Sequence, residues 1–296
     1  MGPDLTATVV IATRDRAESL RRALDSIATA AHAVSAPWEL VVVDNGSSDH
    51  TPEVVESFAG RLPIRRVLAP VPGLSNARNV AIGAAQGRYM IWTDDDVVVH
   101  PDWLAAYFRA FEAYPEAAIF GGRATPRYDE PVNHAFAGHA PYLEGLLARR
   151  DHPEWHDIAP GRTPFGLNYA IRTAQQRTHP YDPELGVAPG RRRGGEETAV
   201  LHAILDGGGA GVWVWDAQVE HMIPPDRQTM NYIDQFYRAQ GQELPLARTL
   251  PQIYLKLARS WLGATLMRLM GKPSWMSSHV NFAKGLGSLD WYRKQP

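Results

Sequence analysis

Short apolar runs alternate with amphipathic stretches through the first third of the chain. Ala7–Ala12 and Glu39–Val43 are rich in β-branched and apolar residues, as expected of strands that are buried on both faces of a parallel sheet. Between them, Ala17–Ala31 repeats its large apolar side chains at helical spacing. Thr51 is suited to cap a second helix, with Pro52 at its first position. This order of strand, helix, strand and helix predicts an α/β fold with right-handed crossovers.

The alternation continues to residue 126. Ser75 is placed to cap a helix that runs to about Ala85, and the apolar run Tyr89–Trp92 follows as a strand. The next helix is expected to stop at Pro115, because proline cannot continue the helical hydrogen-bond ladder. Ala118–Pro126 is typical of another strand. We therefore expect a Rossmann-like, mostly parallel central sheet flanked by helices.

Periodicity weakens between residues 127 and 163, which are rich in Pro, His, Asp and Arg. We expect this segment to be a mobile loop over a ligand site. No pair of its histidines has the spacing that metal ligands show on a helix, so we expect ordinary loop residues: His134, His139, His152 and His156. Further strands are predicted at Phe165–Arg172 and Val212–Trp215, and residues 229–241 and Leu246–Met270 return to helical spacing.

The length of 296 residues suits one large α/β domain, which we place at residues 1–228 with halves 1–117 and 118–228, and a C-terminal helical extension at 229–296. The formal net charge of −2 argues against a general nucleic-acid binder. The chain has no cysteine, which excludes disulfides and thiolate chemistry and suits the cytosol. Its first residues lack the pattern of a signal peptide, and no run approaches the ~18 apolar residues of a membrane span.

Three consecutive carboxylates, Asp94, Asp95 and Asp96, follow a predicted strand. Neighbouring like charges repel one another, so folding alone gives no reason to place them together. A hard divalent cation such as Mg²⁺ or Mn²⁺ removes this repulsion, because such ions prefer oxygen ligands and combine one or two carboxylates with substrate phosphates. A solvated acidic turn is the alternative interpretation of these three residues alone.

Other polar side chains stand at the carboxyl ends of predicted strands. Thr13 and Arg14 follow the first strand and Asp44 follows the second. Ligands of open α/β sheets bind beyond these ends, so we expect the residues to converge with the acidic triplet. Asp44 is suited to accept from a base N–H, and Arg14 to meet a base carbonyl or a phosphate. Asn76 and Arg78, in the first turn of a later helix, are expected to face the same place. Taken singly, each is better explained as an ordinary turn or surface residue, but three aligned strand ends are not.

Four segments stand in the order and spacing of family 2 glycosyltransferases with the GT-A fold, and the chain resembles that family over about its first 100 residues: Thr13–Arg16, Val43–Asp49, Gly73–Asn79 and Thr93–Asp96. The loop Pro70–Leu74 is most similar to the bacterial polysaccharide-assembly branch. The resemblance implies that Thr13, Arg14, Asp44 and Arg78 hold the nucleotide base. It also implies that Asp94 and Asp95 face the ribose and the metal, and that Asp96 binds the cation that bridges the diphosphate.

The resemblance extends to the predicted acceptor half. Phe165–Arg172 is similar to the family segment below the acceptor, where Gly166 permits close approach of the backbone. Where the family commonly has Gly-Glu-Asp with the Asp as catalytic base, this chain has Gly195-Glu196-Glu197. Glu197 therefore takes the place of the base with one more methylene, and Glu196 is its rival. Both also suit a helix N-terminus, where the helix dipole favours acidic residues.

Two later residues complete the expected site. The family often places a histidine as a further metal ligand where this chain has His221, and Arg227 follows within reach of a diphosphate. The resemblance thins beyond about Arg227. The basic run Arg191–Arg193 is expected either to meet phosphates of the donor or acceptor or to be a solvated loop.

The resemblance implies an inverting, divalent-metal-dependent hexosyltransferase that uses Mg²⁺ or Mn²⁺. It would move a sugar from a nucleoside-diphosphate sugar, with a UDP-sugar as the family's suggestion, to a hydroxyl acceptor in cell-surface polysaccharide or glycolipid synthesis. A positioned carboxylate removes the hydroxyl proton, typically giving about 10²–10⁴-fold, from the sugar face opposite the leaving group. A sugar nucleotidyltransferase is one alternative, but Thr13–Arg16 lacks the glycines of its phosphate loop. A non-catalytic nucleotide-sugar-binding subunit is the other, and Glu196 and Glu197 argue against it.

The C-terminal segment around residues 245–280 combines Lys and Arg with Trp and Met at helical spacing. Basic amphipathic helices of this kind suit the surface of an anionic membrane. Packing on the catalytic domain and a dimer contact are the alternatives. We place peripheral membrane contact slightly ahead, because lipid-linked saccharide acceptors are common in polysaccharide assembly. The expected location is the cytoplasm, at the inner face of the cell membrane.

Overall fold

The computed structural model describes residues 5–151, 157–192, 194–243, 245, 247 and 249–294. Contacts divide the chain into two compact units. The first unit comprises Met1–Thr125, Arg150–Arg191 and Gly195–Met222, and the second comprises Pro126–Arg149, Arg192–Gly194 and Ile223–Pro296. This division is one of compactness, and the functional boundaries after residues 117 and 228 stay a prediction.

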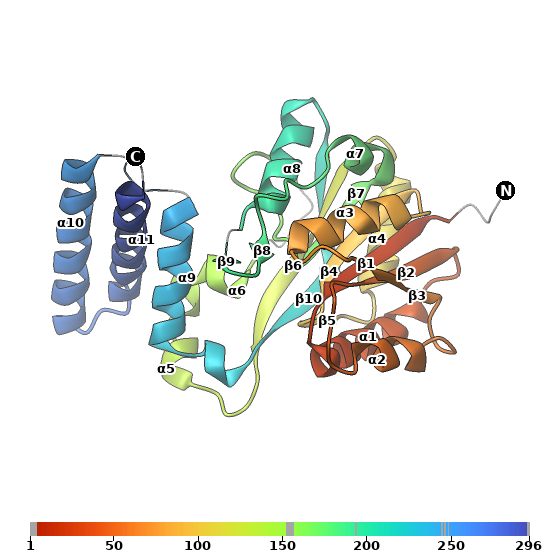
Figure 1. Ribbon diagram of the computed structural model, residues 1–296, viewed down its shortest axis with the longest axis horizontal. Helices are drawn as coiled ribbons and strands as arrows, with labels where there is room; N and C mark the ends of the chain where they lie inside the picture. The colour runs from red at the N-terminus through yellow and green to blue at the C-terminus, as the bar shows by residue number, and fades with distance from the viewer. Residues whose placement is uncertain are drawn as a thin grey trace. The chain divides into compact units, whose positions relative to one another are not determined.

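An eight-stranded sheet forms the centre of the first unit in the described part of the chain, in the order β3-β2-β1-β4-β7-β6-β10-β5 (Figure 1). Its strands are β1 (Ala7–Thr13), β2 (Trp38–Asp44), β3 (Ile64–Leu68), β4 (Tyr89–Asp94), β5 (Val97–Val99), β6 (Ile119–Tyr128), β7 (Asn168–Arg172) and β10 (Gly211–Ile223). The strands β3, β2, β1 and β4 are parallel, which confirms the predicted βαβ units. The strand β7 runs antiparallel to β4 and β6, and β5 runs antiparallel to β10, so the whole sheet is mixed. The short pair β8 (Val187–Ala188) and β9 (Arg191–Arg192) forms a second sheet.

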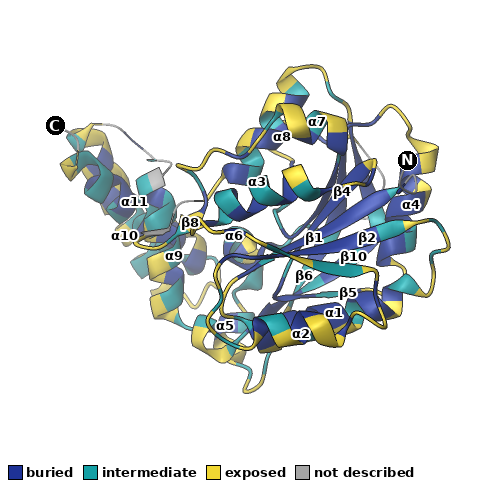
Figure 2. Cartoon of the chain, turned by 45° about the vertical axis from the view of Figure 1, so that its right-hand side comes forward, coloured by how far each residue is buried: buried dark blue, intermediate teal, exposed yellow. Residues whose placement is uncertain are grey.

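Helices cover both faces of the large sheet (Figure 2). On one face lie α1 (Ala17–Ala31) and α2 (Thr51–Ser57), and on the other lie α3 (Leu74–Ala84), α7 (Thr173–Thr178) and α8 (Glu196–Asp206). The helix α4 (Trp103–Ala113) packs against α1. Beneath α3 and α8, apolar side chains of helices and strands form one buried cluster that includes Ala81, Trp92 and Leu201. This cluster fixes the helices that carry the polar residues at the carboxyl ends of the strands.

Two helix caps differ from the predictions. The helix α2 begins at Thr51 itself, whose amide and hydroxyl donate to Asp49 Oδ1 at 3.1 and 2.6 Å, so Thr51 is not the cap. The helix α3 begins at Leu74 after Gly73, and Ser75 Oγ donates to the carbonyl of Leu185 at 2.8 Å instead of capping the helix. Both helices exist where expected, but each predicted capping side chain bonds elsewhere.

The second unit is mainly helical. Its long helices are α9 (Met230–Glu243), α10 (Leu250–Leu269) and α11 (Trp275–Arg293), with α11 between the other two (Figure 1). Its short helices are α5 (His134–Ala137), η1 (Ala140–Tyr142), α6 (Glu144–Leu147) and η2 (Pro225–Arg227). A buried apolar cluster joins α9 and α11 to the short helices. Among the described residues, no helix is long and apolar enough to cross a membrane.

The segment 127–163 is more ordered than its weak periodicity predicts. It contains α5, η1 and α6, so the expectation of a plain loop is wrong for residues 134–147, and its mobility stays a prediction. His134 begins α5, and the ring of His139 meets that of Trp275 edge-on. His152 and His156 lie outside the described residues.

Candidate functional site

The carboxyl ends of β1, β2 and β4 lie side by side. The strand registers set Thr13 opposite Asp44 and Ala12 opposite Asp94, which confirms the convergence predicted from the sequence. Thr13 Oγ1 donates to Asp95 Oδ2 at 2.7 Å and so ties the end of β1 to the acidic triplet. The neighbouring Arg14 side chain is 42% exposed, and its Nε lies 3.6 Å from an oxygen of the next residue, an aspartate. Arg14 therefore reaches solvent rather than the buried carboxylates.

Asp44 is buried, and both of its carboxylate oxygens accept hydrogen bonds. The amide of Ser47 donates to Oδ1 at 2.8 Å, and Arg66 Nη1 donates to Oδ2 at 2.9 Å. Gly46 adopts a φ of +78° that lets the chain turn back over the carboxylate. A carboxylate offers about four acceptor positions, so these two bonds leave room for the N–H of a base. Arg66 lies on the adjacent strand β3, and no sequence motif marks it as a partner of Asp44.

Arg16 neutralises two members of the acidic triplet. Its Nη1 lies 2.5 Å from Asp95 Oδ1 and its Nη2 lies 3.0 Å from Asp96 Oδ2. Burial raises the pKa of Asp95 to about 7, although the Arg16 charge opposes this shift. Sequence reasoning did not assign Arg16 to the site. The only signal was its place at the end of the Thr13–Arg16 segment.

Two of the three predicted metal ligands come together. His221, on β10, lies beside β5 in antiparallel register, and its Nε2 is 3.7 Å from Asp96 Oδ2. Asp94 instead has its Oδ1 3.7 Å from Arg78 Nη2, and burial raises the pKa of Asp94 to about 6. Within the described ranges, no three acidic or histidine side chains are grouped to hold a metal ion by themselves.

The donor set nevertheless fits a divalent cation that also binds a diphosphate. A carboxylate oxygen and an imidazole nitrogen are ligands that Mn²⁺ accepts, and Mg²⁺ sites commonly use only one or two protein carboxylates plus phosphates. Asp96 and His221 supply such a pair. In this structure the guanidinium of Arg16 provides the positive charge next to Asp96. The protein therefore offers part of a cation site, to which a diphosphate would add the remaining oxygens.

A buried ion cluster joins α3 to α8. Arg78 is almost fully buried, and its Nη1 lies 2.8 Å from Glu196 Oε1 and 4.0 Å from Glu197 Oε2. Its guanidinium also lies over the ring of Tyr181, 5.4 Å from the centroid. A Cβ added to Gly166 would come within 3.1 Å of Arg78 Nη2 and 3.3 Å of Glu197 Cδ, so the backbone of Gly166 lies close to these two side chains. Its approach to an acceptor stays a prediction.

The two glutamates at the start of α8 have different surroundings. The Glu196 side chain is 5% exposed and bonded to Arg78, and its Oε2 is buried and has no hydrogen-bond partner among the residues that the structure describes. Burial, together with the neighbouring Glu197 charge, raises the pKa of Glu196 to about 8. The Glu197 side chain is 17% exposed, and its contact to Arg78 is the longer of the two. Glu197 is therefore the carboxylate that an external hydroxyl group reaches more readily.

The remaining predicted residues are more scattered. Asn76 is half-buried, and its Nδ2 donates to the carbonyl of Pro72 at 3.0 Å, within its own turn. Arg227 belongs to the second unit, where its guanidinium lies over the ring of Tyr232, 5.9 Å from the centroid. Of the basic run at 191–193, the last residue and all three side chains lie outside the described part of the structure.

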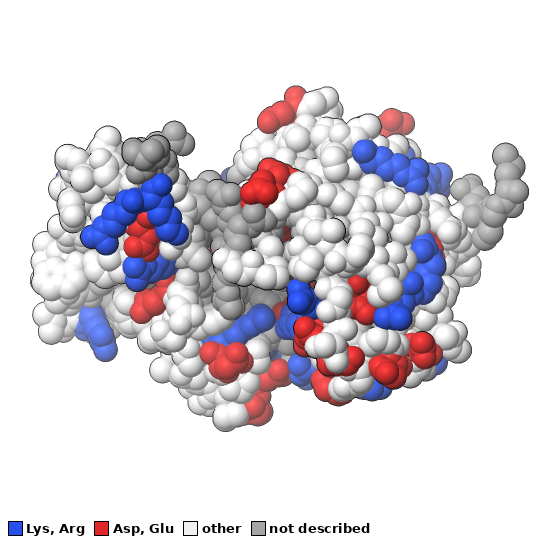
Figure 3. Space-filling view, viewed as in Figure 1, with Lys and Arg blue, Asp and Glu red and all other residues white. Residues whose placement is uncertain are grey.

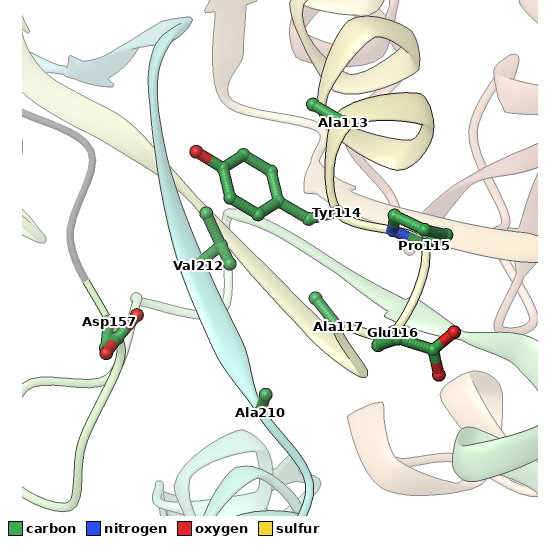
Figure 4. A pocket seen from close by; sticks show the side chains of 8 residues that line it. All are labelled: Ala113, Tyr114, Pro115, Glu116, Ala117, Asp157, Ala210 and Val212. Carbon is green, nitrogen blue, oxygen red and sulfur yellow. The ribbon is translucent and has the colours of Figure 1, made fainter.

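A cavity of about 390 Å³ lies at another part of the first unit. It is lined by residues between α4 and the starts of β6 and β10, including Tyr114, Asp157 and Val212 (Figure 4). The strand registers put the start of β6 level with the start of β4, so this cavity is at the edge opposite the acidic triplet. It is therefore not the site that the strand ends form.

Comparison with known proteins decides the family. The profile described as Glycosyl transferase family 2 matches residues 8–165, which is more than half of the chain and spans the acidic triplet. The chain belongs to glycosyl transferase family 2. The match begins in β1 and ends beside Gly166, so it contains all four segments on which the resemblance was based, and the predicted family is confirmed.

Curated relatives in this family match the same region. The chain is 30% identical over 156 residues to validoxylamine A glucosyltransferase of Streptomyces hygroscopicus. The aligned region covers 51% of this chain and 37% of that protein. It is 38% identical over 102 residues to the succinoglycan biosynthesis protein ExoO of Rhizobium meliloti, covering 34% of this chain and 28% of that protein. The chain thus spans 37% of the first relative and 28% of the second.

Solved structures of similar fold cover nearly the whole chain. The mannosyltransferase PcManGT of Pyrobaculum calidifontis, in complex with GDP-Man and Mn²⁺, superposes with a TM-score of 0.64 at 18% identity and covers 99% of this chain and 89% of its own. TarS of S. aureus, in complex with UDP-GlcNAc, superposes with a TM-score of 0.57 at 15% identity and covers 97% of this chain and 92% of its own. The fold is therefore GT-A, as predicted, with C-terminal helices.

Proposed function

We propose that the protein is an inverting glycosyltransferase that moves a sugar from a nucleoside-diphosphate sugar to a hydroxyl acceptor with the help of a divalent cation. The observation that carries this proposal is that Arg78 contacts both the acidic triplet and the two glutamates at the start of α8. Arg78 lies 3.7 Å from Asp94 of the acidic triplet and contacts both Glu196 and Glu197. Groups suited to a diphosphate and groups suited to proton removal thus adjoin one another.

The donor half would be held at the strand ends. Asp44 would accept from the base, with Thr13 and Arg14 beside it, while Asp94 and Asp95 would face the ribose. Asp96 and His221 would hold Mg²⁺ or Mn²⁺ against the diphosphate. When bound, such a cation stabilises the negative charge that develops on the leaving nucleoside diphosphate. The cation in the neighbour PcManGT supports this use, since that protein is complexed with Mn²⁺ and GDP-Man.

Glu197 is the proposed catalytic base. It is the more accessible of the two glutamates, and its carboxyl carbon lies close to the backbone of Gly166, where a side chain would crowd the carboxylate. Its carboxylate would take the proton of the acceptor hydroxyl while the hydroxyl oxygen attacks the anomeric carbon and the bond from that carbon to the diphosphate breaks. Glu196 would act as the buried partner that holds Arg78 in position. Attack from the face opposite the diphosphate inverts the anomeric carbon.

The donor and the acceptor are proposed by class. A UDP-sugar is the proposed donor, which the UDP-GlcNAc in TarS supports. A GDP-sugar is the competing donor, because PcManGT is complexed with GDP-Man. The acceptor is proposed to be a saccharide hydroxyl, lipid-linked or free, in surface polysaccharide or glycolipid synthesis, as the name of ExoO suggests for that relative. The proposed location is the inner face of the cell membrane.

Turnover of a panel of radiolabelled UDP- and GDP-sugars by the purified protein tests this proposal. We expect nucleoside diphosphate to be released with Mn²⁺ and not with chelator, because the cation stabilises that leaving group. Glu197→Gln should bind donor like wild type and lose transfer to saccharide acceptors, whereas Glu196→Gln, the matched control, should keep measurable transfer. Formation of nucleoside triphosphate and sugar 1-phosphate, only when pyrophosphate is added, would instead indicate a nucleotidyltransferase. Binding without any turnover would indicate a binding subunit.

A further inference from the structure

The helix α10 exposes large apolar side chains along its length. Six of them are half exposed or more: Tyr254 (54%), Leu255 (51%), Trp261 (59%), Leu262 (51%), Leu266 (50%) and Leu269 (80%). On its other side, Ile253 and Leu257 are buried in a cluster with Leu289 of α11. A helix that is apolar all round is normally covered all round. Only one side of α10 is covered in the described structure.

The exposed residues form one continuous face. Positions 254, 255, 258, 261, 262, 265, 266 and 269 follow one another at intervals of one and three, which is the spacing of a single helical stripe. Only Ala258 and Thr265 interrupt the large side chains. Met270, 64% exposed, continues the stripe beyond the helix end. We call this stripe the outer face of α10.

Positive charges border the outer face on both sides. Arg268 follows Trp261 by seven residues on one edge, and Arg259 precedes Leu266 by seven on the other. Lys272 follows shortly after the helix end, and the sequence has no Asp or Glu between residues 244 and 289. In Figure 3 the surface over α10, at the far left, is mainly white with a blue patch.

We propose that the outer face of α10 docks on an anionic phospholipid surface, with the helix lying in the plane of the membrane. Leucine side chains would enter the acyl boundary, and the rings of Trp261 and Tyr254 suit the interface, where aromatic residues are enriched. The arginines and lysines at the edges would extend to the headgroups, each adding attraction to anionic lipid.

A second copy of the chain is a poorer occupant of the same face. A symmetric dimer brings the same patch of both copies together, so the arginines and lysines would meet their own counterparts. No carboxylate lies on α10 to pair with them, and like charges across an interface oppose association. An anionic lipid surface supplies the missing negative charge. This inference does not depend on which sugar the protein transfers, or on transfer at all.

The absence of cysteine from the chain allows a direct test with one environment-sensitive label. Leu262→Cys carries the label on the outer face, and Leu68→Cys carries it on β3 at a matched exposure of 60%. Labelled full-length protein is mixed with vesicles of phosphatidylcholine alone and of phosphatidylcholine with about 30% phosphatidylglycerol. We expect a blue shift, and quenching by nitroxide lipids, only for the label at 262 and only with anionic vesicles.

Flotation of unlabelled variants on the same vesicles completes the test. Leu262→Asp should lower the bound fraction at least about tenfold, because a charge on the apolar face opposes insertion, while Leu68→Asp should bind like wild type. Binding should also weaken in about 0.5 M salt, where screening is strong. Equal binding by wild type and Leu262→Asp would overturn the proposal. So would a concentration-dependent blue shift without vesicles, which would identify a protein interface instead.

Discussion

Replacing Arg78 by Met is expected to destabilise the protein strongly, because Arg78 is nearly buried and lies 2.8 Å from the equally buried Glu196. Removing one partner of a buried ion pair leaves the other charge uncompensated and typically costs about 3–5 kcal/mol, which we expect at pH 9, where Glu196 is ionised in the folded protein. Removing both partners should cost less, so the double variant Arg78→Met/Glu196→Gln should recover part of the loss. Recovery should be incomplete, since Asp94 and Glu197 also lose a positive neighbour.

The loss should also depend on pH, with a sign that follows from Glu196. Burial raises the pKa of Glu196 from 4.5 to about 8 in the folded protein. A carboxyl with a raised folded pKa loses its stabilising contribution as pH rises from the unfolded value through the folded one. Without Arg78 the folded pKa rises further, so the destabilisation should be greater at pH 9 than at pH 6.

Urea unfolding followed by far-ultraviolet circular dichroism measures these differences as changes in midpoint at constant slope. Arg78→Lys, which keeps the charge, is the variant to use if Arg78→Met does not fold. If Arg78→Met lowered the free energy of unfolding by less than about 1 kcal/mol, and the double variant lowered it by the same amount, the reasoning would be refuted. A change of that size is what an exposed ion pair contributes.

Two further predictions concern Arg16 and the second unit. Arg16→Gln should tighten the binding of Mn²⁺ to the nucleotide-free protein by about tenfold, equivalent to about 1.4 kcal/mol, because Asp95 and Asp96 lose their present counter-ion; unchanged or weaker binding in an electron paramagnetic resonance titration would contradict this. Arg238 donates two hydrogen bonds to Asp290, and its hydrogen bonding lowers the pKa of Asp290. Asp290→Asn should therefore lower the free energy of unfolding by about 0.5–1 kcal/mol at pH 7. This difference from wild type should disappear as pH falls through the lowered pKa of Asp290. A difference in thermal unfolding that grows on acidification would contradict this.

The apolar pattern predicted the elements well because burial repeats with the period of each element. Ala17–Ala31 was predicted as a helix and is α1 with those bounds, since its large apolar residues all face the sheet. The strand predicted at Ala7–Ala12 is β1 with one more residue, Thr13. The family resemblance, from segments within the first 100 residues, likewise agreed with the matched family.

Long-range side-chain bonds were beyond such reasoning. Ser75 has the composition of a helix cap, but its hydroxyl bonds to Leu185, 110 residues away in the chain. Arg16 and Asp95 are 79 residues apart, and no periodicity relates them. Arg78 and Glu196 were both assigned to the site, but their mutual ion pair, 118 residues apart, was not foreseen. These pairings depend on strand order and on the packing of α3 and α8, which the local sequence does not contain.

The most direct measurement is calorimetric titration of UDP and of GDP into wild-type protein and into Asp96→Ala, each with Mn²⁺ and with chelator. The account predicts that wild type binds one of the two nucleotides only when Mn²⁺ is present, and that Asp96→Ala loses this binding. Nucleotide affinity that is the same in both proteins, or the same with and without the cation, would contradict a donor site built on the acidic residues after β4.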